Sequence, residues 1–516
     1  MPTTAHAALD PRTPVIVGVG QAVERIEDAG YVGLSAADLA ARAAEAALAD
    51  SGAADRARAA ITAVGAVRTF EDSNAAPFPF GKPDKFPLAV ARRLGITPAL
   101  AVLDKVGGQS PVTLLMEMGA RILAGEAQAA LVFGAEAISS TRHLSAQGQI
   151  RDWAETDDAA MDDRGLGVKG LLSPLAIAHG IVSPPIAYAL MENARRGRLH
   201  ADRVSYARMM GDLFAPFTHI AAANPYACAA SSPLTTDEIA TPTARNRLVS
   251  DPYTIKLVSR DQVNQGAAVL LMSVAAARAA GIPETHWTFI HAAATAQEKD
   301  ILARPQIDAY PAARATLAAA LALAGRVPAD FAAFDLYSCF PIPVFNAMGA
   351  LGLAADDPRG LTVTGGLPYF GGAGNNYSLH AVASMAERLR GHGEARYGLI
   401  GANGGFQSKY AAMVLSSAAA PWRALAHDAI QAGLDAVADV VPVAEANGTG
   451  TIETYTVWRT RGEPANAIVI GTMADGARFI ANAADDATLA LAAQTDLIGA
   501  HVTLSFDGKR NRFSAR

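Results

Sequence analysis

Four short loops carry the residues whose types and spacing could do chemistry. The richest is the segment 364–380, TGGLPYFGGAGNNYSLH, in which several glycines precede the adjacent amides Asn375 and Asn376. Glycine lets the backbone approach a ligand closely, and an asparagine amide can hold a polar group or cap a helix. The other loops are VGGQSP (106–111), LYSCFP (336–341) and GANGGFQSK (401–409). Each follows an apolar run, which is typical of loops that converge on a pocket at one edge of an α/β core.

The composition limits the classes of protein that these loops could serve. With 516 residues the chain exceeds one ordinary domain, so two or more core units are expected. A balance of 43 Lys and Arg against 49 Asp and Glu gives a net charge of −6 and no broad basic surface for nucleic acid. Cys228 and Cys339 lack metal-ligand spacing and indicate a reducing compartment. Because no signal peptide or membrane-spanning run is apparent, we expect a soluble cytoplasmic protein without a bound metal.

Two parts of the chain repeat the same order of elements. In each part a strand-like run precedes an alanine-rich helix, a short acidic connection and an apolar run. These stretches are 15–19, 35–50 and 61–70 in the first part, and 289–293, 311–324 and 331–340 in the second. Ser35 is the expected cap of the first helix, and Gly325 is the expected stop of the second. The repetition predicts an α/β protein with two βαβ-rich halves.

The rest of the chain differs from both halves. Between them lies a proline-rich segment with basic side chains and little strand periodicity, which predicts a largely helical insertion. After a linker at 416–421, the stretches 451–459, 467–473 and 501–506 contain many β-branched and aromatic residues, which predicts a small β-rich domain of the OB type. The predicted domains are a first half at 1–136, a loop domain at 137–260, a second half at 261–418 and a C-terminal domain at 421–516.

Six segments, in their order along the chain, resemble those of the thiolase superfamily. Three are loops described above, and the others are GEAQAALVFGAEA (125–137), ANPYA (223–227) and DPYTIKL with VNQGAAVLLMS (251–273). The resemblance covers about residues 12–516 and is to a subgroup close to the sterol-carrier-protein thiolases, labelled acetyl-CoA acetyltransferase or thiolase-like protein type 1. It implies a thiolase fold with αβαβα layers, and a C-terminal addition that most thiolases lack.

The resemblance also shows that the usual nucleophile and histidine of a thiolase are missing. The nucleophilic cysteine falls at about Ser110, whose hydroxyl would need an adjacent base; the alternative for this serine is a helix cap. Gly371-Gly372-Ala373 replaces the Gly-His-Pro histidine. His380 is a substitute only if its helix faces the pocket, and a packing histidine is the alternative.

Two further positions keep groups that could act on a thioester. Tyr337 takes the place of an asparagine or histidine that helps to hold a water in the oxyanion site, and it could act as an acid. Ala402 replaces the second cysteine, and the adjacent Asn403 could bind an oxyanion. Cys339 lies in an apolar run, which favours a buried inert thiol.

Coenzyme A (CoA) or acyl-CoA is the implied ligand, bound as a substrate rather than as a permanent cofactor. Its predicted contacts are Gly371, Gly372, Asn375, Asn376, Gly404 and Arg196. Other basic residues of the loop domain are candidates for its phosphates or else a solvated helix face: Arg142, His143, His179, Arg195, Arg198 and His200. The resemblance suggests a homodimer, and an accessory protein is a further alternative.

Several functions are compatible with this scaffold. One is an acyltransferase-like enzyme of lipid metabolism that makes or breaks C–C bonds on acyl-CoA through Tyr337, His380, Asn403 or Ser110. Others are a retro-aldol lyase on 3-hydroxyacyl-CoA, a noncatalytic acyl-CoA or lipid-binding protein, and a structural subunit. A Rossmann dehydrogenase is discounted, because Gly18-Val19-Gly20 has no third glycine before a helix.

Overall fold

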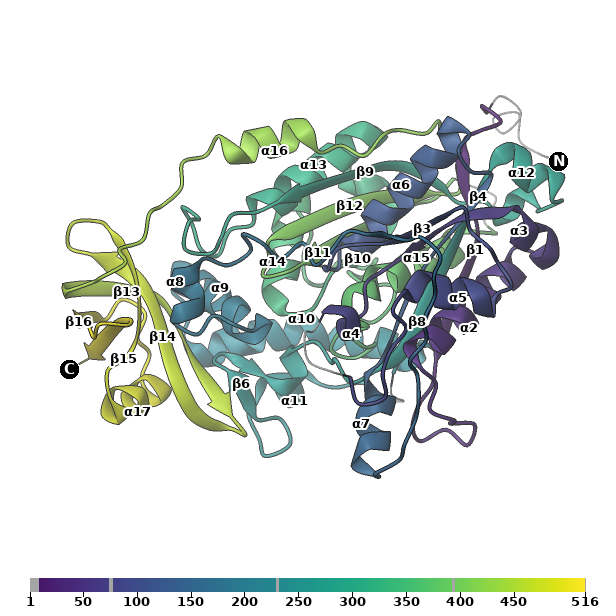
Figure 1. The fold of residues 1–516 in the computed structure, drawn as a ribbon. Coiled ribbons are helices and arrows are strands. Elements are labelled where there is room, and N and C mark those ends of the chain that lie inside the picture. The colour runs from purple at the N-terminus through teal and green to yellow at the C-terminus, as the bar shows by residue number, and fades with distance from the viewer. Residues whose placement is uncertain (1–8, 74–77, 229–231, 392–394, 516) are drawn as a thin grey trace.

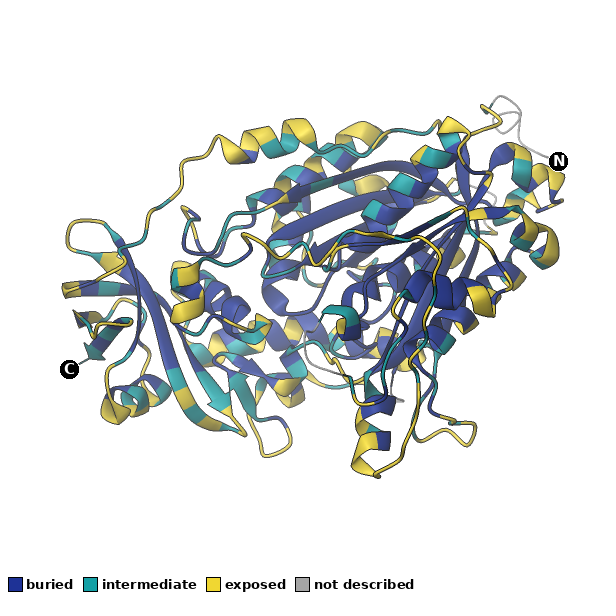
Figure 2. Cartoon of the chain, in the orientation of Figure 1, coloured by how far each residue is buried: buried dark blue, intermediate teal, exposed yellow. Residues whose placement is uncertain are grey.

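The computed structural model describes residues 9–73, 78–228, 232–391 and 395–515, and it contains two stacked sheets and a separate β-rich domain (Figure 1). The first sheet has the order β1 (Pro14–Val23), β8 (Asn264–Ser273), β4 (Ala129–Ala137), β2 (Ile61–Ala66), β3 (Leu100–Leu103) and β5 (Asp162–Asp163). The second sheet has the order β10 (Phe331–Leu336), β11 (Tyr397–Gly404), β12 (Lys409–Ser416) and β9 (Phe289–Gln297). Apart from the short edge strand β5, whose two aspartates are exposed, the strands are buried almost throughout, which explains their apolar runs (Figure 2).

Helices form three layers around the sheets. The outer layers are α2 (Ala36–Asp50) and α5 (Phe86–Arg93) on the first sheet, and α13 (Pro311–Ala324) and α14 (Pro341–Leu351) on the second. Between the sheets lie α6 (Ser110–Ala124) and α15 (Tyr377–Leu389), whose apolar residues join one core with strands of both. This arrangement confirms the predicted thiolase fold with αβαβα layers.

The repeated βαβ order is also present in the structure. In the first half, α2 begins at Ser35, whose side chain and that of Asp38 form a capping box. In the second half, α13 ends at Gly325, which adopts a left-handed backbone with φ of 63°. The shorter elements are α3 (Ala54–Ala60), α4 (Phe70–Ser73), α12 (Val274–Ala279) and 3₁₀ turns at Ile255–Leu257, Glu284–His286, Pro328–Asp330 and Gly374–Asn376.

The boundary between the halves differs from the prediction at residue 261. Strand β8 lies antiparallel between β1 and β4, so it belongs to the first sheet, and the second half begins only with β9. Every residue of β8 is buried. A run that is apolar on both faces does not reveal which sheet it joins, so the sequence pattern could not assign it.

The loop domain is largely helical and closes one edge of the first sheet. Its elements are α7 (Ile138–Ala146), α8 (Pro174–Ala178), α9 (Pro184–Arg198), α10 (Arg203–Ala223), α11 (Thr236–Ala240), β6 (Leu248–Ser250) and β7 (Tyr253–Thr254). The short strand β5 pairs with β3, and Arg68 of the first half forms an ion pair with Asp163 of β5. The edge of β3 is therefore covered by the same chain.

The C-terminal domain is a closed barrel. Its strands pair in the ring β13 (Gly448–Thr460), β14 (Glu463–Met473), β15 (Arg478–Ala483), β17 (Asn511–Ala515), β16 (His501–Phe506) and back to β13. Helix α17 (Asp486–Gln494) connects β15 and β16, and α16 (Asp428–Asp435) lies on the segment that leads to the barrel (Figure 1). Trp458 of β13 also pairs with Ser250 of β6, so the barrel sheet continues into the loop domain. This topology agrees with the predicted OB-type domain.

Two features of the described residues concern membrane and metal binding. Within these ranges, no helix combines the length and apolar character needed to cross a bilayer. Nor do the described His, Cys, Asp and Glu side chains form a group of three or more that could hold a metal ion.

Candidate active site

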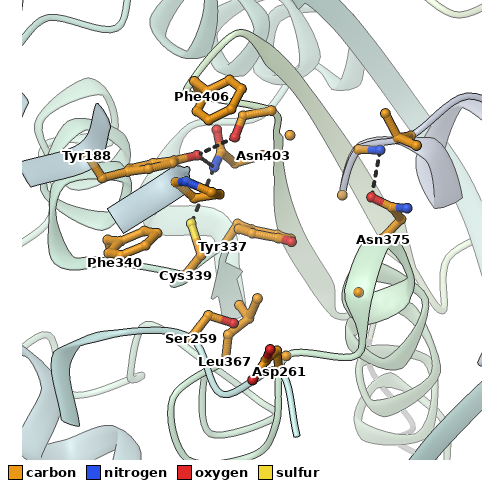
Figure 3. Close-up of a pocket in the computed structure, with 18 of the residues that line it drawn as sticks. Tyr188, Ser259, Asp261, Tyr337, Cys339, Phe340, Leu367, Asn375, Asn403 and Phe406 are labelled. Atoms are coloured by element: carbon orange, nitrogen blue, oxygen red, sulfur yellow. Dashed lines mark hydrogen bonds between the residues drawn. The ribbon is translucent and has the colours of Figure 1, made fainter. Parts of the chain in front are cut away.

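The four loops singled out in the sequence converge on a cavity of about 710 Å³ (Figure 3). They contribute Val106, Gly107 and Gly108; Tyr337, Cys339 and Phe340; Gly372, Gly374 and Asn375; and Asn403, Gly404, Gly405 and Phe406. The loop domain adds mainly apolar groups: Val168, Leu171, Pro184, Pro185, Tyr188 and Val258. The cavity therefore lies between the core and the loop domain, as expected for an α/β core with a covering insertion.

The wall at the start of α6 carries no side chain that could act as a nucleophile. Gly107 and Gly108 line the cavity there. A Cβ atom at Gly108 would lie 2.5 Å from the hydroxyl of Tyr337 and 2.4 Å from the carbonyl oxygen of Asn403. Glycine is thus required at this position, because the Tyr337 ring fills the space where a side chain would stand.

Ser110 lies outside the cavity. It is fully buried in the first turn of α6, where its hydroxyl donates a 2.6 Å hydrogen bond to the Asp104 carboxylate. The N-cap position belongs to Gln109, so the interpretation of Ser110 as a cap is also wrong. Although the Asp104 carboxylate is close enough to serve as a base, Ser110 is not among the residues that line the cavity and has no access to a ligand there.

Tyr337 presents a free hydroxyl to the cavity. Its ring makes an edge contact with Tyr377, with 5.3 Å between centroids, and extends across the cavity beside Cys339 (Figure 3). Among the described residues its hydroxyl finds no hydrogen-bond partner, whereas most tyrosines of the site are paired. Burial raises the pKa of Tyr337 well above the usual value, so the phenol stays protonated and can donate.

Asn403 belongs to a closed network of polar groups. Its Oδ1 accepts from the Tyr310 hydroxyl at 2.9 Å, while its Nδ2 donates to the Tyr188 hydroxyl at 2.8 Å and to Cys339 Sγ at 3.5 Å. Tyr188 in turn stacks on Phe340, with 4.4 Å between centroids. Because these amide groups are already paired, Asn403 shapes the cavity rather than offering a free oxyanion donor.

Cys339 is a neutral thiol in this network. Burial raises its pKa to about 12, so almost no thiolate forms at neutral pH. This agrees with the prediction of an inert buried cysteine, although the sequence did not show that its side chain would line the cavity.

The glycine-rich segment 364–380 mainly supports the cavity wall and contributes few side chains to the cavity itself. Asn375 accepts from the Gly107 N–H at 2.8 Å and donates to the Arg68 carbonyl at 2.8 Å, so it ties two loops together. Asn376 donates to the Gly134 carbonyl behind the wall. Gly372 and Gly404 line the cavity. Gly371 lies behind it, where a Cβ would stand 2.3 Å from Gln265 Oε1.

Comparison with known proteins decides the family. Residues 429–509 match the model of the thiolase-like protein type 1 additional C-terminal domain. A monomeric SCP2-thiolase-like protein type 1 from Mycobacterium smegmatis is 42% identical, covers 98% of this chain over 100% of its own, and superposes with a TM-score of 0.84. The chain belongs to this family.

More distant structures share the fold alone. An aldolase titled Ltp2-ChsH2(DUF35) is 18% identical, with a TM-score of 0.57, over 78% of this chain and 98% of its own. Human mitochondrial 3-ketoacyl-CoA thiolase in complex with CoA is 17% identical, with a TM-score of 0.50, over 79% and 99%. No curated protein sequence matches the chain. The M. smegmatis relative is described as monomeric, which differs from the homodimer that the wider thiolase resemblance suggested.

In this member of the type 1 family, His380 does not replace the missing thiolase histidine. It is fully buried in α15, with Nδ1 2.8 Å from Gln21 Oε1 and its ring against Phe370. Burial lowers its pKa to about 3, so the ring is neutral. The helix turns this side chain toward the first sheet and away from the cavity, which makes it the packing histidine.

The predicted phosphate ligands in the loop domain are also engaged elsewhere. Arg196 is buried and donates to both carboxylate oxygens of Asp496 in the barrel, at 2.6 and 2.7 Å, so its prediction as a CoA contact is wrong. Arg142 and Arg198 pair with Asp261 and Asp308, His179 bonds the barrel backbone at Asn511, and Arg195 lies over the Phe345 ring. The charge pattern could not show these partners, because they are remote in sequence.

Sequence reasoning missed several residues around the cavity. Lys105 and Lys169 are exposed beside the lining residues Val106 and Val168, and neither forms an ion pair with a described residue. Behind the opposite wall, Glu136 accepts from the Phe70 N–H at 2.8 Å, and burial raises the pKa of Glu136 and of its neighbour Glu71, the latter to about 8. The sequence could have indicated Lys105 and Lys169, because each lies next to a glycine-rich loop.

Proposed function

We propose that the protein cleaves 3-hydroxyacyl-CoA thioesters by a retro-aldol reaction. The observation that carries this proposal is the unpaired, protonated hydroxyl of Tyr337 in a cavity whose described lining holds no activated nucleophile. Thiolysis and acyl transfer through an acyl-enzyme need an activated nucleophile. Ser110 is buried away from the cavity and Cys339 is a neutral thiol, so neither supports that route.

The retro-aldol reaction requires fewer groups. A base takes the proton of the 3-hydroxyl, the bond between C2 and C3 breaks, and the electron pair passes to the thioester as an enolate. The enolate then takes a proton, which yields a shortened acyl-CoA and an aldehyde or ketone. Tyr337 is suited to hydrogen-bond the enolate oxygen, because its phenol is neutral and free, and the proton held by the base then returns to C2. Asp261, a residue of the same cavity lining whose carboxylate pairs with Arg142 at 3.0 Å, is the candidate base.

The rest of the cavity suits the remainder of an acyl-CoA. Apolar side chains from the loop domain cover most of its wall and would contact the acyl and pantetheine carbons. Gly108 and Gly405 line it, and their backbone N–H groups donate to no acceptor among the described residues. Exposed Lys105 and Lys169, which adjoin the lining residues Val106 and Val168 in the chain, would face the phosphates of CoA.

A second candidate is a noncatalytic acyl-CoA-binding protein. It is favoured by the closed network of Asn403, Tyr188 and Tyr310, because these polar groups already bond one another and are not free to act on a substrate. The two functions differ in whether Tyr337 is needed for turnover.

Mass spectrometry of 3-hydroxyacyl-CoA and 3-ketoacyl-CoA panels, each with and without free CoA, tests the proposal. We expect shortened acyl-CoA from the 3-hydroxy substrates without added CoA. Tyr337→Phe should lower this turnover by about 10²- to 10⁴-fold while CoA affinity is retained. Tyr31→Phe, a phenol whose hydroxyl bonds Ser140 outside the cavity, is the matched control. Products that require free CoA would establish thiolysis instead, and intact thioesters with measurable CoA affinity would favour the binding protein.

A further inference from the structure

The loop 404–408 of the cavity is held in an unfavourable conformation from outside. Gln407 is a buried non-glycine residue with a φ of 51°, in the left-handed region. Its side-chain amide finds no hydrogen-bond partner among the described residues, so the side chain does not stabilise this backbone. Such a conformation persists only where neighbouring groups enforce it. The neighbours that contact the backbone of Gln407 are the Tyr188 hydroxyl and the Arg304 guanidinium.

Arg304 holds the far side of this loop by its carbonyl groups. Its Nη2 donates to the Phe406 carbonyl at 3.2 Å and to the Gln407 carbonyl at 2.9 Å, and its Nε donates to Lys299 at 2.9 Å. The side chain is 2% exposed and pairs with no carboxylate of a described residue. Apart from a 3.7 Å contact of Nη1 with Met191 Sδ, its guanidinium bonds backbone carbonyls, which commits it to positioning backbone. Phe406 lines the cavity, so this contact fixes part of its wall.

The segment that carries Arg304 is held in turn by the C-terminal barrel. Arg478 of β15 donates to the carbonyls of Leu302 at 3.1 Å and Pro305 at 3.2 Å, and to that of Arg304 itself. Its side chain is 6% exposed, and its nearest carboxylate is that of Glu453 at 3.7 Å. Two buried arginines in series thus connect a barrel strand to the cavity wall.

We propose that Arg478 is a positioning residue for the cavity, and that the barrel completes the ligand site through Arg478 and Arg304. Loss of Arg478 would free the 302–305 segment and let Arg304 shift. Gln407 could then leave its left-handed conformation, and Gly405 and Phe406 would move with it. The choice of CoA as a probe ligand rests on the proposed function, whereas the mechanical connection does not.

Arg478→Met, compared with Arg459→Met, tests the proposal. Arg459 is also a barrel arginine, but it pairs with Asp251 of the loop domain at 2.8 and 3.1 Å and does not contact the 302–305 segment. Without ligand, amide hydrogen exchange at 404–409 should rise by about tenfold or more in Arg478→Met and by less than about twofold in Arg459→Met. Affinity for CoA should fall about tenfold in Arg478→Met only, with Arg478→Lys intermediate.

The double variant Arg478→Met with Arg304→Met distinguishes a series connection from two separate contributions. It should weaken CoA affinity no more than the Arg304→Met variant alone, because both substitutions interrupt the same connection. Unchanged exchange at 404–409 in folded Arg478→Met, or an equal rise in Arg459→Met, would overturn the proposal. If Arg478→Met does not fold, Arg478→Lys must show the local rise, and its absence is decisive. If wild type fails to bind CoA, the proposed function fails while the exchange data still decide the role of Arg478.

Discussion

The two halves of the core share an order of elements but give the cavity different chemistry. The first half contributes Gly107 and Gly108, and thus only backbone, at the start of its inner helix. The second half contributes the side chains of Tyr337, Cys339 and Asn403. The duplicated strands and helices determine which loops reach the cavity, whereas the residue types in each loop determine the chemistry that the loop can support. In this chain Tyr337, Cys339 and Asn403 of the site lie in the second half, whereas Asp261 precedes β8 of the first sheet.

Single buried ionisable groups of the two halves also differ. Behind the first-half wall lie Glu71 and Glu136, two carboxyls that burial favours in the protonated form. The second half has a similar buried acid in Asp335, but its His380 is buried in the neutral form. The contributions of Glu71 and His380 to stability should therefore respond to pH in opposite directions.

The largest expected effect comes from adding a methyl group to the bare first-half wall. Gly108→Ala places a Cβ against the Tyr337 ring and the Asn403 carbonyl, and should lower the free energy of unfolding by about 3 kcal/mol. Gly349→Ala is the matched control, because Gly349 lies in the second-half helix α14 with open space around it. It should raise stability by about 0.5–1 kcal/mol. Urea denaturation measures the free energy of unfolding of both variants. An equal change in the two variants would contradict the close packing of Tyr337 and Asn403 against Gly108.

Glu71→Gln tests the acid side of the comparison. The pKa of Glu71 is raised in the folded protein to about 8, so the folded state holds a proton that the unfolded chain releases near its ordinary value of 4.5. Its contribution is complete below that ordinary pKa and is lost as pH rises through 8. From pH 5 to pH 7 the stability of Glu71→Gln relative to wild type should rise by about 2 kcal/mol. Denaturation curves measure this difference in stability. If it does not change with pH, Glu71 is not a buried acid with a raised pKa.

His380→Gln tests the opposite response in the second half. The pKa of His380 is lowered in the folded protein to about 3, so its contribution is complete above the ordinary value of 6.5 and is lost as pH falls. Between pH 7 and pH 5 the variant should gain about 2 kcal/mol relative to wild type. The control is His143→Gln, a partly exposed histidine of α7. The same trend in both variants would mean that burial is not the cause.

The smallest effect is expected for Ser110→Ala. Loss of the hydrogen bond to Asp104 should lower the free energy of unfolding by about 1 kcal/mol, while turnover per folded molecule stays unchanged. Turnover measured beside thermal unfolding separates these quantities. A hundredfold loss of turnover with an unchanged fold would restore Ser110 as a nucleophile and move the chemistry back to the first half.

Local signals explain how much of the fold could be predicted. A serine followed three residues later by an acid makes the Ser35 cap, and a glycine free to adopt positive φ makes the stop at Gly325. The cavity loops were predictable for a similar reason, since strands that end at one edge bring their following loops together.

The missed features depend on partners far away in the sequence. Strand β8 joins the first sheet because β1 and β4 leave a place for it, which its own apolar pattern does not encode. Arg196 was predicted to contact a ligand because its charge was visible, but Asp496 lies 300 residues later in the chain. Tyr337 was predicted at the site, but its ring can occupy its place in the cavity only because Gly108, far away in the sequence, has no side chain.

The pairing of Trp458 with Ser250 affects how the barrel could be exchanged between relatives. Strand β13 contributes to the closed ring and also to an edge formed with β6, while the adjacent Arg459 pairs with Asp251. A chimera cut only at the linker before α16 would keep β6 and β7 of one parent against a foreign strand. The natural unit of recombination is therefore the barrel together with residues 248–254.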